Sequence, residues 1–189
     1  MDTREKILLE SMRLFAVHGF EATSVRAIAK EVGVANSALY RHFASKREIF
    51  DAIVDRCRER FIAESGKLAK SAGLGLEYIK YFCLDMYRFQ THDEWITLFR
   101  QMLLIEQFKS ALMRETYHKF FVEMPVLRIA AVFTQLAEQR LIKNKDPYML
   151  ATQLYAPFYL HHLDEGAELD AAAALLKKHV DTFYEENLI

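Results

Sequence analysis

The stretch from residue 23 to residue 50, TSVRAIAKEVGVANSALYRHFASKREIF, constrains the fold of this chain more than any other. Apolar residues recur at helical spacing from Val25 to Val32, directly after two hydroxyl residues that suit an N-cap. Gly33 ends this helix, because glycine adopts the left-handed conformation without strain. After a tight turn, a second helix is expected from about Asn36 to Phe43. The stretch therefore predicts two short helices joined by a glycine turn.

A third helix is expected to begin at Lys46, because Ser45 and Glu48 have the spacing of a capping box. Two short helices joined by a glycine turn are typical of the helix-turn-helix motif. The second helix of that motif lies in the major groove of DNA, and the first crosses the backbone. The same spacing also fits a small helical corner that only packs. We favour the DNA interpretation, since the outward residues of the second helix are hydrogen-bonding groups.

The polar residues of this stretch suit both kinds of DNA contact. Arg41 has the geometry to read guanine, and Asn36 could read adenine or cap its own helix. Tyr40, Thr23 and Lys46 are better suited to phosphate groups, which the opening turn of a helix also attracts. The predicted DNA-contacting residues are Thr23, Ser24, Arg26, Asn36, Ser37, Tyr40, Arg41, His42 and Lys46.

The N-terminal quarter of the chain resembles the DNA-binding domain of TetR-family transcriptional regulators. The resemblance rests on Ile7, Leu8, Leu14, Phe15, Gly19, Phe20, Thr23, Ser24, Val25, Ile28, Ala29, Gly33, Val34, Leu39, Tyr40, Phe43, Ser45 and Lys46. The rest of the chain agrees with the family in length and helical texture only. One departure is Ala35, where the family usually has Ser or Thr as the cap of the recognition helix. The cap could shift to Asn36, which would prevent that side chain from reading a base.

Composition indicates a folded, soluble protein, since 52% of the 189 residues are hydrophobic and 27% are charged. Its two cysteines, Cys57 and Cys83, lack a metal-type spacing and suggest a reducing compartment. The start of the chain is charged, and no apolar stretch approaches the ~18 residues of a membrane span. A cytoplasmic protein with no membrane partner is therefore expected.

The charge is distributed unevenly along the chain. The net charge of −1 argues against a broadly basic surface. Residues 1–50 nevertheless carry eight Lys or Arg against six Asp or Glu, a net +2, and the remainder carries −3. We expect DNA binding to depend on individually placed contacts and on doubling through a dimer.

Beyond residue 50 every pattern is helical, without alternating strands. The sequence predicts an all-α fold of about nine helices in two domains. Residues 1–50 would form the helix-turn-helix DNA-binding domain, and residues 51–189 a helical ligand-binding and dimerisation domain. The helix that opens at Lys46 is expected to run to about Leu68–Lys70, and it would belong to both domains as a candidate lever.

The segment between Tyr78 and Phe133 is dense in aromatic and methionine side chains. A packed core explains most of them. The functional alternative is an apolar pocket between helices with a few polar tips. The residues predicted for such a pocket are Tyr81, Trp95, Phe99, Arg100, Met102, Tyr117, Phe121, Tyr155 and Tyr159.

Two prolines lie in helical tracts. Pro125 cannot donate a backbone hydrogen bond, so it frees the carbonyl of Phe121, unless one helix ends and another begins there. Pro157 frees the carbonyl of Gln153 in the same way, usually with a kink. A ligand or water could take such a carbonyl.

The last two predicted helices carry apolar stripes with small alanines that permit close approach of a partner helix. Burial within the same chain is the alternative. The TetR resemblance implies pairing of two chains through these helices into a four-helix bundle. The residues predicted for this interface are Ala151, Leu154, Phe158, Leu169, Ala172, Ala173, Leu176, Val180 and Phe183.

No catalytic arrangement is recognisable, and we expect neither an enzyme nor a cofactor. Adjacent His161 and His162 point about 100° apart on a helix, so a metal site is not expected either. The resemblance implies a homodimeric repressor that binds a palindromic operator and is released by a small hydrophobic ligand. One alternative is a DNA-binding dimer whose C-terminal domain senses no small molecule and only dimerises or binds a protein. Another is an enzyme or carrier that uses the aromatic interior.

Overall fold

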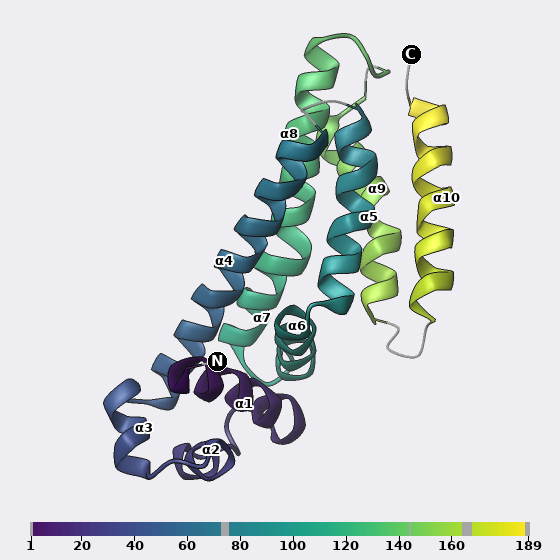
Figure 1. Ribbon diagram of the computed structural model, residues 1–189. Coiled ribbons are helices and arrows are strands. Elements are labelled where there is room, and N and C mark those ends of the chain that lie inside the picture. Colours follow the sequence, from purple (N-terminus) through teal and green to yellow (C-terminus); the bar gives the residue numbers. More distant parts are fainter. Residues whose placement is uncertain (1, 73–75, 144, 164–167, 188–189) are drawn as a thin grey trace. The chain divides into compact units, whose positions relative to one another are not determined.

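The computed structural model describes residues 2–72, 76–143, 145–163 and 168–187 (Figure 1). The described residues form ten α-helices, one π-helical turn and no β-strand. In chain order these are α1 (Thr3–His18), α2 (Val25–Val32), α3 (Asn36–His42), α4 (Lys46–Ala72), α5 (Leu76–His92), α6 (Glu94–Glu106), α7 (Ala111–His118), η1 (Lys119–Glu123), α8 (Met124–Glu138), α9 (Pro147–Leu163) and α10 (Leu169–Asn187). Because α7, η1 and α8 follow one another without a break, they count as one helix. The all-α prediction of about nine helices is confirmed.

The chain forms two compact units. Unit 1 comprises Met1–Ile62 and Glu94–Tyr117, and unit 2 comprises Ala63–Asp93 and His118–Ile189. Helix α6 therefore belongs to the same unit as the N-terminal helices. Local sequence patterns do not predict this association, because the two segments are far apart in the chain. The predicted functional division at residue 50 stays a prediction.

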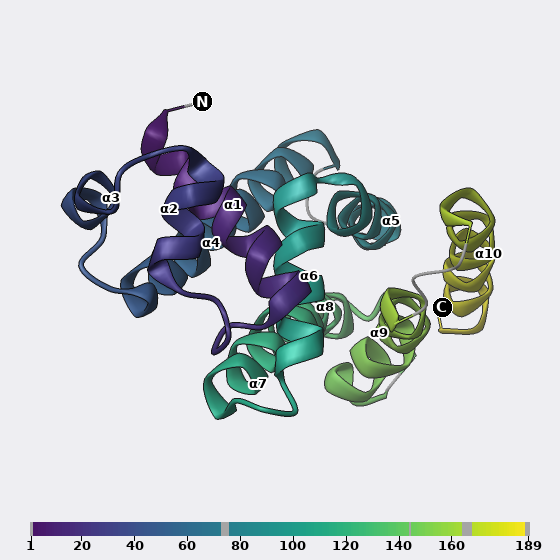
Figure 2. The same cartoon turned by 90° about the horizontal axis from the view of Figure 1, so that it is seen from below.

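The core of unit 1 forms where α1 packs against α2 and α6 (Figure 2). Phe20, in the turn between α1 and α2, lies edge-on to Phe15 and to Phe50, with ring centroids 5.0 and 5.7 Å away. Phe15 and Phe50 are fully buried. Buried aromatic contacts of this kind hold the turn against α1 and α4, which fixes the direction in which α2 leaves it.

Helix ends in unit 1 are set by side-chain caps. Asp2 accepts a hydrogen bond from the Glu5 N–H at 2.8 Å and caps α1. Ser24 accepts one from the Ala27 N–H at 3.1 Å and caps α2. One half of the predicted capping box is present, since Ser45 accepts from the Glu48 N–H at 3.1 Å. The Glu48 carboxylate accepts from the Ala44 N–H at 2.6 Å instead of from that of Ser45.

Gly33 has the left-handed backbone that the predicted turn required, with φ of 78°. Its N–H donates to the carbonyls of Ala29 and Lys30, which closes the last turn of α2. The prediction of a glycine turn between two helices is confirmed.

In unit 2, α9 packs against α8 and α10, and α10 packs against α5 (Figure 1). Asp181 of α10 forms ion pairs with Lys177 at 2.7 Å and with Lys80 of α5 at 2.5 Å. Hydrogen bonds from Lys177 and Lys80 lower the pKa of Asp181. Burial raises the pKa of the Cys83 thiol to about 12, so this cysteine stays protonated and unreactive at neutral pH.

Pro125 is the second residue of α8 and follows closely after the π-helical turn η1. The freed carbonyl of Phe121 accepts a hydrogen bond from the Tyr155 hydroxyl of α9 at 2.8 Å. The predicted loss of a helix bond at Pro125 is therefore compensated by a side chain from the neighbouring helix. Pro157 lies inside α9, as predicted.

The described residues contain one helix, Ala111–Glu138, that is long and apolar enough to cross a membrane by length and composition alone. The core helix of a soluble protein meets the same criterion. Its buried side chains Ile129 and Phe133 belong to the core of unit 2.

Candidate nucleic-acid interface

Helix α3 exposes polar side chains and is fixed by two apolar ones. Leu39 is fully buried and Phe43, directly after the helix, is 1% exposed. The exposed residues are Asn36, Ser37, Tyr40, Arg41 and His42. A short helix with this arrangement presents hydrogen-bonding groups to solvent while its inner face holds it rigidly to unit 1.

The N-terminus of α3 lacks a side-chain cap. Ala35 is the N-cap residue, and its carbonyl accepts from the N–H groups of Ala38 and Leu39 at 2.9 and 3.1 Å. Asn36 is the first helical residue. The expectation that Asn36 could take over the cap is therefore wrong, and its exposed amide is not engaged in that role.

Thr23 differs from the other predicted contacts. It is 3% exposed, and its hydroxyl donates to the Gly19 carbonyl at 2.8 Å and lies 3.4 Å from that of Leu14. Burial therefore corrects the prediction that Thr23 contacts phosphate, since its hydroxyl holds the turn after α1. Ser24, which is exposed, caps α2.

An open groove of about 550 Å³ runs between the start of α2 and the start of α3. Its lining residues are Ser24, Arg26, Ala27, Lys30, Val34 and Asn36. Arg26 and Lys30 are four residues apart and therefore lie on the same side of α2. Lys30 was not among the predicted contacts, although its spacing from Arg26 was the signal that could have identified it.

Ion pairs divide the cations of unit 1 into two groups. Four on α1 and α4 are paired with carboxylates: Arg13 with Glu10 and Glu94, Arg47 with Asp51, Arg56 with Glu5 and Glu59, and Arg58 with Asp55. In the described part of the chain, Arg26, Lys30 and Arg41 have no carboxylate within ion-pair distance. Uncompensated positive charge therefore gathers on α2 and α3.

Arg4 adds to this charge from the start of α1. Its guanidinium lies over the ring of Phe43, 5.0 Å from the centroid. A cation–π contact of this type fixes the guanidinium without cancelling its charge. No sequence pattern indicates this contact, because Arg4 and Phe43 are distant in the chain.

Lys46, at the start of α4, is partly buried. Its ammonium donates to the carbonyls of Phe20 at 2.5 Å and Glu21 at 3.1 Å, and lies over the Phe20 ring at 4.5 Å. The Glu21 carboxylate is 3.9 Å away. The side chain is thus held beside the turn that precedes Ser24, on the same side of unit 1 as the start of α2.

Residues 7–53 match the family model described as bacterial regulatory proteins, tetR family. This N-terminal stretch is therefore a TetR-family domain. The chain is 38% identical over 61 residues to the HTH-type transcriptional repressor ComR of Escherichia coli K12, which is 32% of this chain and 29% of ComR. It is 36% identical over 61 residues to the regulator UidR of the same strain, covering 32% of this chain and 31% of UidR. The matched stretch thus spans less than a third of the curated relatives.

Solved structures of TetR-type regulators share the whole fold. A SmeT–triclosan complex matches with a TM-score of 0.77 and 19% identity, over 100% of this chain and 93% of that one. A transcriptional regulator from Aquifex aeolicus VF5 matches with a TM-score of 0.73 and 22% identity, over 96% of this chain and 99% of that one. At these identities the likeness concerns the fold alone.

The predicted pocket residues divide between the two units. Trp95, Phe99, Arg100, Met102 and Tyr117 belong to unit 1, and Tyr81, Phe121, Tyr155 and Tyr159 to unit 2. Seven are buried, Tyr159 is half-buried, and Tyr81 is 53% exposed. Because the nine residues are divided between two separately described units, the predicted pocket stays a prediction.

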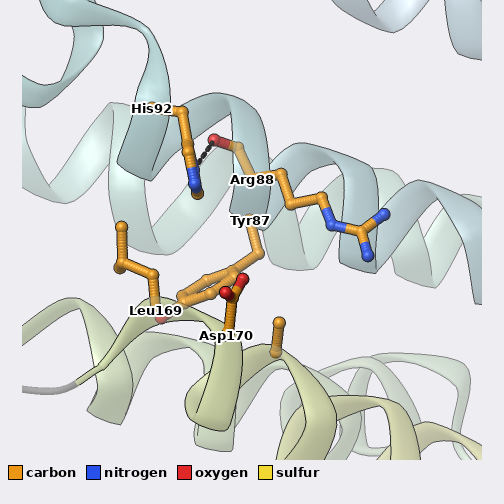
Figure 3. Close-up of a pocket in the computed structure, with 6 residues that line it drawn as sticks. Tyr87, Arg88, His92, Leu169 and Asp170 are labelled. Atoms are coloured by element: carbon orange, nitrogen blue, oxygen red, sulfur yellow. Dashed lines mark hydrogen bonds between the residues drawn. The ribbon is translucent and has the colours of Figure 1, made fainter.

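A small cavity of about 100 Å³ lies between α5 and α10 in unit 2 (Figure 3). It is lined by Tyr87, Arg88, His92, Leu169, Asp170 and Ala173. The His92 ring bonds the Arg88 carbonyl at 3.0 Å, and the Arg88 guanidinium points away from Leu169 and Asp170 (Figure 3). Drug-sized ligands need about 300–1,000 Å³, so this cavity does not suit one.

Burial also bears on the residues predicted for dimerisation. Seven of them are buried within this chain: Ala151, Leu154, Phe158, Ala172, Leu176, Val180 and Phe183. Ala173 is half-buried, and Leu169 is 37% exposed. Within one chain the seven belong to the core of unit 2, which corrects the predicted set. The exposed apolar residues of α9 and α10 are instead Tyr148, Met149, Leu160, Leu163, Leu169 and Leu175.

The adjacent histidines have different surroundings. His162 is 2% exposed and stacks on Tyr87 with ring centroids 5.3 Å apart, whereas His161 is half-buried. Among the described residues, no group of three or more His, Cys, Asp or Glu side chains has an arrangement that could hold a metal ion. Asp164 and Glu165, which follow the histidines in sequence, lie outside the described residues.

Proposed function

We propose that this protein is a DNA-binding transcriptional regulator that places α3 in the major groove. The observation that carries the proposal is the exposed polar face of α3, held by buried Leu39 and Phe43. Arg26, Lys30 and Arg41, on α2 and α3, have no carboxylate partner among the residues that the structure describes. Such a surface combines base-reading groups with an electrostatic attraction for the DNA backbone. Named regulators among the relatives support the same activity.

The roles of individual residues follow from their chemistry. Arg41 reads guanine, and Asn36, which is not occupied as a helix cap, reads adenine. Tyr40 and Lys46 contact phosphate groups, together with the cations of the α2 groove and Arg4. Ser37, His42 and Ser24 complete the contact surface, since all three are exposed. Thr23 is left out because its hydroxyl is buried.

The regulator acts as a homodimer on a palindromic operator. A single seven-residue helix reads too few bases for specificity, and paired recognition helices about 34–36 Å apart match one turn of DNA. The exposed apolar residues of α9 and α10, among them Leu160 and Leu175, offer the surface for pairing. The site of action is the cytoplasm, and no catalytic activity is part of the proposal.

The regulator is a repressor that a small hydrophobic ligand releases from DNA. The SmeT structure, which is that of a triclosan complex, supports a ligand-responsive fold of this type. Such a ligand acts by preferring a conformation whose recognition helices do not match the operator. The second candidate is a regulator whose C-terminal domain only dimerises or binds a protein partner, and the cavity of about 100 Å³ between α5 and α10 is itself too small for a drug-sized ligand.

Selection of bound fragments from the source organism's genomic DNA tests the proposal. We expect enrichment of fragments that share an inverted repeat, with half-sites one helical turn apart. A matched selection with Arg41→Ala protein should lose the shared sequence while retaining weak binding. Enrichment of no common sequence by the wild-type protein would rule out an operator-binding regulator.

A further inference from the structure

The turn between α1 and α2 is held from two directions at Phe20. Its N–H donates to the carboxylate of Glu106, the last residue of α6, at 3.3 Å. Its carbonyl accepts from the Lys46 ammonium at 2.5 Å, and its ring lies under the same ammonium. One residue therefore connects α6 with the first residue of α4, entirely within unit 1.

The contact with Phe20 requires the carboxylate of Glu106 to be buried. It is 2% exposed, and a buried carboxylate is unfavourable unless hydrogen bonds compensate for the lost water. Besides the Phe20 N–H, the ammonium of the exposed Lys109 pairs with this carboxylate at 3.2 Å. Gly19 makes room for it, because a Cβ at that position would lie 2.9 Å from the Glu106 Oε1. The turn and the carboxylate are thus mutually fitted.

Lys46 is pre-positioned by the turn. An ammonium has three N–H donors, and the carbonyls of Phe20 and Glu21 engage two of them. One donor is left for a phosphate oxygen. A lysine held in this way loses less conformational freedom when it binds DNA than a lysine extended into solvent.

We infer that Glu106 is a positioning residue for Lys46, acting through the backbone of Phe20 to set the contribution of Lys46 to DNA affinity. Glu106 touches no DNA itself, because it is buried. The inference rests on the proposed function, since Lys46 must contact the DNA backbone. It makes α6 a helix whose position is communicated to a phosphate contact through the α1–α2 turn.

The test is a double-mutant cycle measured by fluorescence anisotropy with a fluorescein-labelled duplex of mixed sequence. Glu106→Met removes the acceptor of the Phe20 N–H, and we expect it to weaken binding about 2- to 10-fold, the range of one lost hydrogen bond. Glu106→Gln keeps an acceptor oxygen and should bind nearly as well as the wild type. In a Lys46→Met background, Glu106→Met should have no further effect. Both Met variants should lower the salt dependence of binding by about one phosphate contact.

Glu94→Gln is the matched control. Glu94 is the other α6 carboxylate bonded to α1, through Arg13, but it has no contact with the α1–α2 turn among its described bonds. We expect this variant to bind the duplex as the wild type does. If Glu106→Met does not fold, Glu106→Asp replaces it, because the shorter side chain keeps the charge and withdraws from the Phe20 N–H.

The outcomes separate this inference from the proposed function. A wild-type protein that does not bind DNA would refute both the inference and the proposed function. Wild-type binding with an unaffected Glu106 variant, or an equal loss from that variant with and without Lys46, would overturn the positioning role alone. An effect of Glu94→Gln as large as that of Glu106→Met would do the same, because it would indicate a general role of α6 packing.

Discussion

The sequence predicts a functional face on α3 and another on α9 and α10. The structure leaves the predicted face exposed on α3 but buries it on α9 and α10. In α3 the polar face is exposed and the apolar residue Leu39 is buried, as the pattern indicates. In α9 and α10 the apolar stripe chosen for pairing, with Phe158 and Leu176 at its centre, is buried within the same chain.

The difference teaches what an apolar stripe can and cannot specify. A helical pattern identifies the face that must leave water, but it does not say whether the covering surface belongs to the same chain or to a second copy. A short polar helix carries no such ambiguity, because its buried side needs only one or two anchors. The exposed apolar residues that remain after folding, and not the stripe itself, indicate a partner surface.

Truncation of Phe158 gives the largest expected effect. Phe158 is 1% exposed and stacks on Tyr155 at 6.4 Å between centroids. Phe158→Ala should lower the free energy of unfolding by about 3–5 kcal/mol, as is usual for a buried aromatic. Chemical denaturation should give the same loss at every protein concentration. A loss of stability that vanishes at high protein concentration would indicate that Phe158 contacts a second chain.

Leu160→Glu probes the other face of the same helix. Leu160 is 64% exposed, so a charge there should change the stability of the single chain by only about 0.5 kcal/mol. If this face pairs two chains, the buried charge weakens dimerisation by about 3 kcal/mol, which sedimentation measures directly. Ile62→Glu, on α4 at 63% exposure, is the matched control and should leave the association unchanged. Unchanged association in both variants would exclude Leu160 from the interface.

Local rules predicted most of the DNA-binding surface. Gly33, the Ser45–Glu48 cap and the anchor Leu39 each act within a few residues, so the pattern of the chain alone places them. These constraints also determine that the side chains of Arg41 and Tyr40 point toward solvent. Sequence was sufficient here because the determining interactions are local.

The misses have non-local causes. Thr23 was one of two hydroxyl residues that could cap α2, and only the position of the Gly19 carbonyl decides which one is buried. The contact of Arg4 with Phe43 and that of Glu106 with Phe20 join residues far apart in the chain. Helix patterns contain no information on such pairs, which depend on how α1 packs against α3 and α6.

Arg41→Ala sharpens the contrast between specificity and affinity on α3. Arg41 is exposed and free of carboxylate partners among the described residues, so its removal should not disturb the fold. We expect a loss of about 1–3 kcal/mol of discrimination at one base pair, measured with operator variants once the operator is known. Lys30→Ala should instead weaken all duplexes equally. An equal loss for every sequence with Arg41→Ala would reassign Arg41 to the backbone.

Neutralising Glu21 gives the smallest expected effect. It tests whether a carboxylate beside Lys46 lowers the affinity for DNA. The Glu21 carboxylate is 87% exposed and lies 3.9 Å from the Lys46 ammonium, where it competes with a phosphate. Glu21→Gln should therefore strengthen duplex binding, by about 0.2–1 kcal/mol at low salt and by less at high salt, because exposed pairs are weak and screened. Glu59→Gln removes an equal charge on α4, where Glu59 pairs with Arg56 at 3.0 Å. The same gain from both variants would mean that net charge, and not the surroundings of Lys46, controls the affinity.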